Sequence, residues 1–209
     1  MFWLIVLNRP PNVIFVGLGE VMREDYWFAF FWLLVIGSWV FGVAFGRWVG
    51  VGGGFFLELS KAVRVPSDFG AWWEPLVYFI FTTVAVFALA QLFFGAGAAL
   101  FLFARGFYDS TLIMSAESSV RGWSFPNLPI SEFINVLLIV LILAVNLPLC
   151  LWAGHMGTQR SLYVWHRLTG KPVKPEAGVR PMRDFLLVLA ASIVAGLVAS
   201  FLFSFAQQV

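Results

Sequence analysis

The stretch LVYFIFTTVAVFALAQLFFGAGAALFLFARGFYDSTLIMS, residues 76–115, contains only two charged side chains, Arg105 and Asp109. As a single helix it would be about 60 Å long, at ~1.5 Å per residue, which is twice the ~30 Å hydrocarbon thickness of a bilayer. The chain must therefore fold back, and the small residues 95–98 (GAGA) are the expected turn. Because 209 residues are too few to bury such a hairpin in a soluble domain, we expect an integral membrane protein.

The composition of the whole chain indicates the same class. Hydrophobic residues make up 61% and charged residues 11% of the sequence, whereas about 25% of residues are charged in an ordinary soluble domain. The 24 Phe and 10 Trp are typical of proteins whose aromatic rings lie at the membrane interface. A net charge of +2, without a pattern of basic and aromatic residues, argues against a nucleic-acid partner.

Cysteine, histidine and motif content give no sign of catalysis. The one cysteine, Cys150, excludes an internal disulfide and a CxxC site. The only histidines, His155 and His166, lack an accompanying cluster of Cys or carboxylate residues, whereas a metal site needs three or four ligands. The chain contains no GxSxG, HExxH or Walker motif. We therefore expect a non-enzymatic protein with no catalytic residue, no metal and no cofactor.

The apolar segments predict an all-α, polytopic bundle that forms one membrane domain over residues 1–209. Five transmembrane helices are expected, at about residues 27–50, 76–94, 97–115, 131–154 and 184–205. The alternative has four spans. In it, one long helix over residues 76–104 replaces the hairpin, and an interfacial helix follows.

The distribution of basic residues predicts part of the topology. Segment 155–183 is expected to be an irregular loop, and it holds six of the 13 basic residues: Arg160, Arg167, Lys171, Lys174, Arg180 and Arg183. By the positive-inside rule this loop is cytoplasmic, so the C-terminus lies outside a cell membrane that the chain crosses several times. The N-terminus is then inside with five spans and outside with four, and the rule does not choose between them.

Small residues recur every four positions on two of the expected spans. The first span carries Ser38, Gly42, Gly46 and Gly50, and the last carries Ser192, Gly196, Ser200 and Ser204. In lipid, helices associate through close packing, so small residues mark contact faces. The two ridges are expected to pack against each other or to build a homo-oligomer.

Four intramembrane polar residues and one proline are the candidate functional positions. Arg105 and Asp109 are four residues apart, so that on a helix they can neutralise each other. Charges inside a membrane are costly and indicate function by default, unless the pair lies at the interface. Gln91 could hydrogen-bond to Asn146 or Arg105 across helices. Pro148 is expected to kink the fourth span, and Asn146 could bond to the backbone groups that the kink frees or reach a neighbouring helix.

Several local features resemble the stage II sporulation protein M family of small polytopic membrane proteins. They are the segment LFLFARGFYDS with Arg105-Gly106, the segment NLPLCLWAG followed by a basic loop, and a last helix rich in small residues. The resemblance covers about residues 27–209, and Asp109 departs from the small or apolar residue expected at its position. In spore formers the family member is a membrane partner of two cell-wall hydrolases. The resemblance therefore implies a membrane scaffold or partner, not an enzyme.

Three functional hypotheses follow. The first is a non-enzymatic membrane subunit or scaffold that contacts lipids and assembles, through its small-residue faces, with itself or with other membrane proteins. The second is a small oligomeric transporter or channel with a polar path through Arg105 and Asp109. The third is an accessory subunit of a larger membrane complex.

Overall fold

The computed structural model describes residues 18–49, 70–121, 130–170 and 176–207. These residues form helices and no strand. The helices are α1 (Leu18–Val49), α3 (Glu74–Leu92), α4 (Ala96–Arg121), α5 (Ile130–Leu141), the π-helical segment η4 (Ile142–Asn146), α6 (Leu147–Leu168) and α7 (Glu176–Ala206). The all-helical class expected from the sequence is confirmed for this part of the chain.

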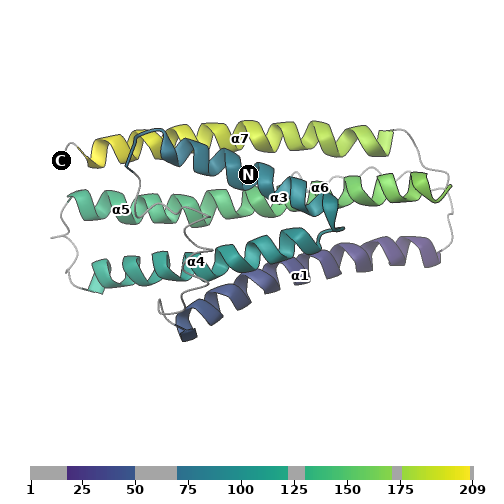
Figure 1. Ribbon diagram of the computed structural model, residues 1–209, viewed down its shortest axis with the longest axis horizontal. Helices are drawn as coiled ribbons and strands as arrows, with labels where there is room; N and C mark the ends of the chain where they lie inside the picture. The colour runs from purple at the N-terminus through teal and green to yellow at the C-terminus, as the bar shows by residue number, and fades with distance from the viewer. Residues whose placement is uncertain (1–17, 50–69, 122–129, 171–175, 208–209) are drawn as a thin grey trace.

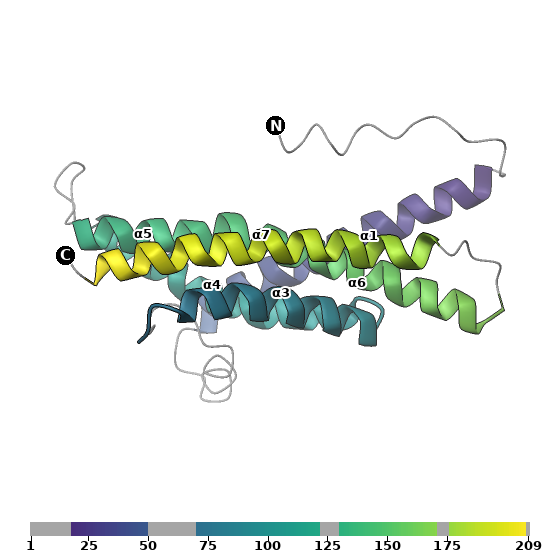
Figure 2. The ribbon, with the colours of Figure 1, turned by 90° about the horizontal axis from the view of Figure 1, so that it is seen from above.

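The helices lie side by side along the long axis of the molecule (Figure 1). Helices α1, α4 and α7 run in one direction, and α3 runs in the opposite direction, together with the rod formed by α5, η4 and α6 (Figure 1). The most extensive contact joins α1 to α4, and α3 packs against α6, α7 and α4. Both views show α7 running alongside the α5–α6 rod (Figure 2).

The expected hairpin is present, and glycine forms its turn. Helix α3 ends at Leu92 and α4 begins at Ala96, with Phe94 at φ +50° and Gly95 at φ +93° between them. A Cβ on Gly95 would also lie 2.9 Å from Oγ1 of Thr158, so both the backbone conformation and the available space require glycine. The alternative of one continuous helix over residues 76–104 is therefore wrong.

Four helices in the described part of the chain are long and apolar enough to cross a membrane. They cover Ala29–Val49, Glu74–Leu92, Phe133–Leu168 and Gly178–Ala206. Large apolar side chains point outward along them; Leu33 is 74% exposed and Phe201 is 73% exposed. An apolar outer surface of this kind suggests a membrane-embedded protein. Helix α4 has 26 residues but is not among the four, because its charged residues lower its mean hydropathy.

The prediction of an irregular loop over residues 155–183 is wrong for most of its length. Helix α6 continues to Leu168, and α7 already begins at Glu176, with Pro181 inside it. Residues 171–175, with Lys171 and Lys174, lie outside the described residues. The basic residues mark where the chain becomes polar, and a helix does not have to end there, because Arg and Lys are good helix formers.

Candidate functional site

An ion pair between Arg105 and Asp109 lies in the interior of the bundle. Both residues are on α4, and Nε of Arg105 lies 3.3 Å from Oδ2 of Asp109. Their side chains are 1% and 0% exposed, respectively. The pair is therefore not at an interface where the side chains could reach water. An isolated ion in such a place would be costly, so its remaining polar contacts decide whether the site is stable.

The guanidinium of Arg105 bonds mainly to the rod formed by α5, η4 and α6. Its Nη1 donates to Oδ1 of Asn146 at 2.6 Å and to Sγ of Cys150 at 3.1 Å. Its Nη2 donates to the backbone carbonyl of Ile142 at 3.4 Å. The guanidinium carbon also lies 5.9 Å from the centre of the Tyr78 ring, within the range of a cation–π contact. Arg105 thus joins α4 to η4, α6 and α3.

Two further side chains complete this group. Nε1 of Trp39, on α1, donates to Oδ2 of Asp109 at 2.8 Å. Oγ1 of Thr82, on α3, lies 3.3 Å from Oδ1 of Asn146. We call the set Trp39, Thr82, Arg105, Asp109, Asn146 and Cys150 the Arg105 cluster. It draws side chains from α1, α3, α4, α6 and the end of η4, so it ties four separate passes of the chain together.

The rod around Asn146 departs from regular α-helix. Residues Ile142–Asn146 are π-helical, and the N–H of Leu147 bonds to the carbonyl of Ile142, five residues back. Pro148 follows directly and has no N–H to donate. The kink expected at Pro148 stays a prediction, and the structure shows a π-helical turn directly before it. This turn leaves the Ile142 carbonyl available to Arg105 as well, and such turns are frequent at functional sites.

Two buried polar atoms of the cluster have no hydrogen-bond partner in the described part of the chain. They are Oδ1 of Asp109 and Nδ2 of Asn146. Each atom belongs to a side chain that is 0% exposed. Unsatisfied polar atoms at such positions are rare, and they indicate either local strain or a role that the folded chain alone does not fulfil.

Gln91 is not part of the cluster, contrary to its expected place beside Arg105 or Asn146. Its Nε2 bonds to the carbonyl of Phe87 on its own helix, at 3.4 Å, and its backbone carbonyl accepts a bond from Ser161. Trp39, in contrast, was missed by the sequence analysis. A tryptophan in the middle of an apolar span is a usable signal, because its N–H needs a partner once it is buried.

The small-residue ridge of the last span faces α3. Oγ of Ser192 donates to the carbonyl of Phe79 at 2.8 Å, and the N–H of Leu76 donates to Oγ of Ser200 at 3.2 Å. A Cβ on Gly196 would lie 3.0 Å from Cα of Leu76. Ser204 is half-buried near the end of α7. This face is thus filled within the chain.

The ridge of the first span faces α4, so the two ridges do not pack against each other as one expectation had it. A Cβ on Gly42 would overlap the carbonyl oxygen of Phe103, and one on Gly46 would overlap Ser110. From the other side, a Cβ on Gly106 would overlap the carbonyl of Trp39. Gly50 lies outside the described residues. Gly42 and Gly46 therefore face a helix of the same chain.

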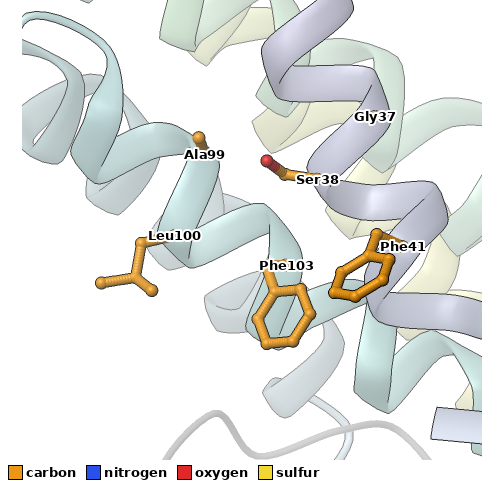
Figure 3. A pocket seen from close by; sticks show the side chains of 6 residues that line it. All are labelled: Gly37, Ser38, Phe41, Ala99, Leu100 and Phe103. Atoms are coloured by element: carbon orange, nitrogen blue, oxygen red, sulfur yellow. The ribbon is translucent and has the colours of Figure 1, made fainter. Parts of the chain in front are cut away.

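Ser38 lies at the edge of this interface, in an open groove between α1 and α4 (Figure 3). The groove is lined by Gly37, Ser38, Phe41, Ala99, Leu100 and Phe103 (Figure 3). Its lining is mostly apolar, and no member of the Arg105 cluster belongs to it. This groove therefore gives no polar access to the buried charges.

The Arg105 cluster combines an ion pair with hydrogen bonds to the neighbouring helices. Among the described residues, no group of three His, Cys, Asp or Glu side chains comes together in a way that could hold a metal ion. Comparisons with protein-family models, curated proteins and solved structures found no match to this chain. The resemblance to the stage II sporulation protein M family stays a prediction, and the function has to be argued from the geometry.

Proposed function

We propose that this protein is a non-enzymatic, multi-pass membrane subunit in which the Arg105 cluster holds the helices together as one scaffold. The observation that supports it is that the cluster is buried and that its side chains bond to one another across helices. Arg105, Asp109 and Asn146 are at most 1% exposed, and their bonds join four passes of the chain. A buried ion pair that is hydrogen-bonded to α1 and to the α5–α6 rod specifies one arrangement of helices, because shifting either of them leaves buried polar groups without their hydrogen-bond partners in a medium of low dielectric.

The burial and pairing of these charges also support five membrane crossings. Helix α4 is about 39 Å long at ~1.5 Å per residue, enough to cross a bilayer. Its hydropathy is low because Arg105 and Asp109 count as free charges, whereas in the fold they pair with each other. In the five-span arrangement the α6–α7 connection faces the cytoplasm and the C-terminus lies outside, in agreement with the positive-inside rule.

Under this proposal, partner proteins contact the outer apolar surface of the bundle. The central residues of both ridges are in contact with α4 or α3, so they are not available to a second copy or to another subunit; these residues are Gly42, Gly46, Ser192, Gly196 and Ser200. Side chains such as Phe41, Leu100 and Phe201 are 63–73% exposed and face outward. Lipids cover such surfaces, and so do the helices of other membrane proteins.

A transporter or channel is the second candidate. It is favoured by the two buried atoms without a partner, Oδ1 of Asp109 and Nδ2 of Asn146, and by the π-helical turn beside them. In transporters, polar side chains and irregular helices at membrane depth form the sites that bind the cargo. This function needs a second conformation that opens the cluster to water.

One double variant separates the two candidates. Arg105→Met with Asp109→Leu removes both charges and leaves none unpaired, and apolar replacements of a buried ion pair are often neutral or stabilising. A scaffold should stay folded and should co-purify from its native membrane with the same proteins, in the same ratio, as the wild type. A folded double variant that loses those proteins, or a wild type that purifies alone, would contradict the scaffold. A proton or ion flux in vesicles that only the wild type supports would establish the transporter.

A further inference from the structure

One end of the bundle extends beyond the α3–α4 hairpin. The backbone carbonyl of Gln91 accepts a bond from Ser161, which places the end of α3 beside that residue of α6. Helix α6 continues for seven further residues, to Leu168, and the ring of Phe94 at the hairpin tip contacts Trp165 in this extension. Arg160 of α6 bonds to Sδ of Met182 on the neighbouring helix α7, so the residues of α7 that precede Met182 lie beyond the hairpin as well.

The exposed side chains of this end are of two kinds that rarely share a water-facing surface. The basic side chains of Arg180 and Arg183 are 79% and 73% exposed. Among them lie exposed apolar side chains: Leu168 is 78%, Val179 is 69% and Trp165 is 50% exposed. Basic residues next to exposed Trp and aliphatic residues are typical of surfaces in the headgroup layer of a membrane.

The register of α7 connects this end to the apolar surface of the bundle. Arg183 is followed at four and eleven residues by Leu187 and Val194, which are 67% and 61% exposed. Positions with this spacing lie on one face of a helix. A basic side chain at the end of an exposed apolar stripe matches a phospholipid, whose phosphate lies above its acyl chains.

Among the side chains that the structure describes, the nearest carboxylate leaves this basic site only partly neutralised. Asp184 lies 3.8 Å from Nε of Arg180 and 3.7 Å from Nε of Arg183, so one carboxylate is shared between two guanidinium groups. Each guanidinium has five N–H donors in a fixed geometry that suits phosphate oxygens. The two arginines thus lie close together at one carboxylate, and because their side chains are 79% and 73% exposed they remain accessible to a ligand of negative charge.

We propose that Arg180 and Arg183, at the start of α7, bind the headgroup phosphate of an anionic phospholipid, with its acyl chains along Leu187 and Val194. Trp165 and Leu168 of α6 lie in the same headgroup layer. Each basic residue near an anionic membrane surface contributes to such attraction, which weakens as salt is added. The inference requires that the bundle lie in a bilayer, and it is independent of the choice between scaffold and transporter.

The test uses the full-length protein in nanodiscs of phosphatidylcholine, with or without phosphatidylglycerol. The wild type should unfold at a higher temperature when phosphatidylglycerol is present, and Arg180→Gln with Arg183→Gln should lose roughly half or more of that rise. Arg47→Gln is the matched control, because Arg47 is exposed at the other end of the bundle, where it pairs with Glu117. This control should keep the full rise.

Four outcomes would overturn the proposal. The first is a double variant that keeps the full rise in unfolding temperature. The second is an equal unfolding temperature of the wild type in both lipid compositions. The third is that inorganic phosphate, added to protein in phosphatidylcholine alone, reproduces the rise, because the ligand would then be a soluble anion and not a lipid. Loss of the whole rise in the Arg47→Gln control would show a general charge effect and would equally contradict the site.

Discussion

At the scale of single residues, the stability of the bundle depends on the counterion of Arg105. In Asp109→Asn the guanidinium keeps Asn146 and the Ile142 carbonyl but loses its only negative partner among the described residues. Breaking a buried ion pair from one side costs about 3–5 kcal/mol. We therefore expect Asp109→Asn to lower the free energy of unfolding by that amount, as measured by reversible unfolding in mixed micelles.

The exposed ion pair at the end of α1 is the control for this variant. Nη2 of Arg47 lies 2.5 Å from Oε1 of Glu117, and the two side chains are 46% and 44% exposed. Surface pairs of this kind contribute about 0–1 kcal/mol. Glu117→Gln should therefore change the free energy of unfolding far less than Asp109→Asn does. Equal effects would show that Asp109 is solvated and that the buried cluster does not form.

Trp39 provides a second test of the same site. Trp39→Phe keeps an aromatic ring in place but removes the Nε1 donor that holds Oδ2 of Asp109. Leaving a buried carboxylate without one of its donors costs about 1–3 kcal/mol. Trp48→Phe, at a position that is 84% exposed, should have little effect. Thermal unfolding of both variants in the same detergent measures the difference, and a stable Trp39→Phe protein would show that the bond is dispensable.

The limits of sequence reasoning at this scale follow from what a helix pattern contains. The four-residue spacing of Arg105 and Asp109 was enough to predict their pairing, because both lie on one helix. The partners Trp39, Asn146 and Cys150 come from other helices, so their contacts depend on how the helices rotate against each other. Gln91 illustrates the same limit: its depth was plausible, but its side chain bonds within α3.

At the scale of the helices, close approach of α1 and α4 requires glycine at specific positions. In Gly46→Ala the new methyl group would overlap Ser110 and the carbonyl of Phe107. In Gly37→Ala, nine residues earlier on the same helix, it would meet nothing within 4 Å. Both changes gain helix propensity of up to about 1 kcal/mol. We therefore expect Gly37→Ala to be neutral or stabilising and Gly46→Ala to be destabilising in thermal unfolding.

The opposite order of stability would mean that α1 and α4 do not touch along this face.

The four-residue spacing correctly marked Gly42 and Gly46 as packing positions, but it could not name the helix they face. The expected pairing of the two ridges failed because Gly106 and Ser110 give α4 its own small-residue face, opposite α1. The ends of α6 and α7 were missed for another reason: charge marks the limit of the apolar span, whereas a helix can continue into the polar layer.

At the scale of the whole molecule, the number of crossings decides on which side the two termini lie. Leu168, at the end of α6, and Gln207, after α7, are separated by one helix, so they should lie on opposite sides of the membrane. We expect Leu168→Cys to react with a membrane-impermeant maleimide only after the membrane is opened, and Gln207→Cys to react in intact cells. The wild type is the control, because its single cysteine, Cys150, is buried and should not react.

A reporter fused to the N-terminus then tests whether α4 crosses the bilayer. Helices α1, α3 and α4 and the α5–α6 rod lie between the start of α1 and Leu168. If α4 crosses with its buried ion pair, there are four crossings and the N-terminus shares the side of Leu168. If α4 lies at the surface, there are three, and the N-terminus is on the side of Gln207. We expect the first result, because the bonds of Asp109 with Trp39 and of Arg105 with Asn146 hold α4 at the depth of its neighbours.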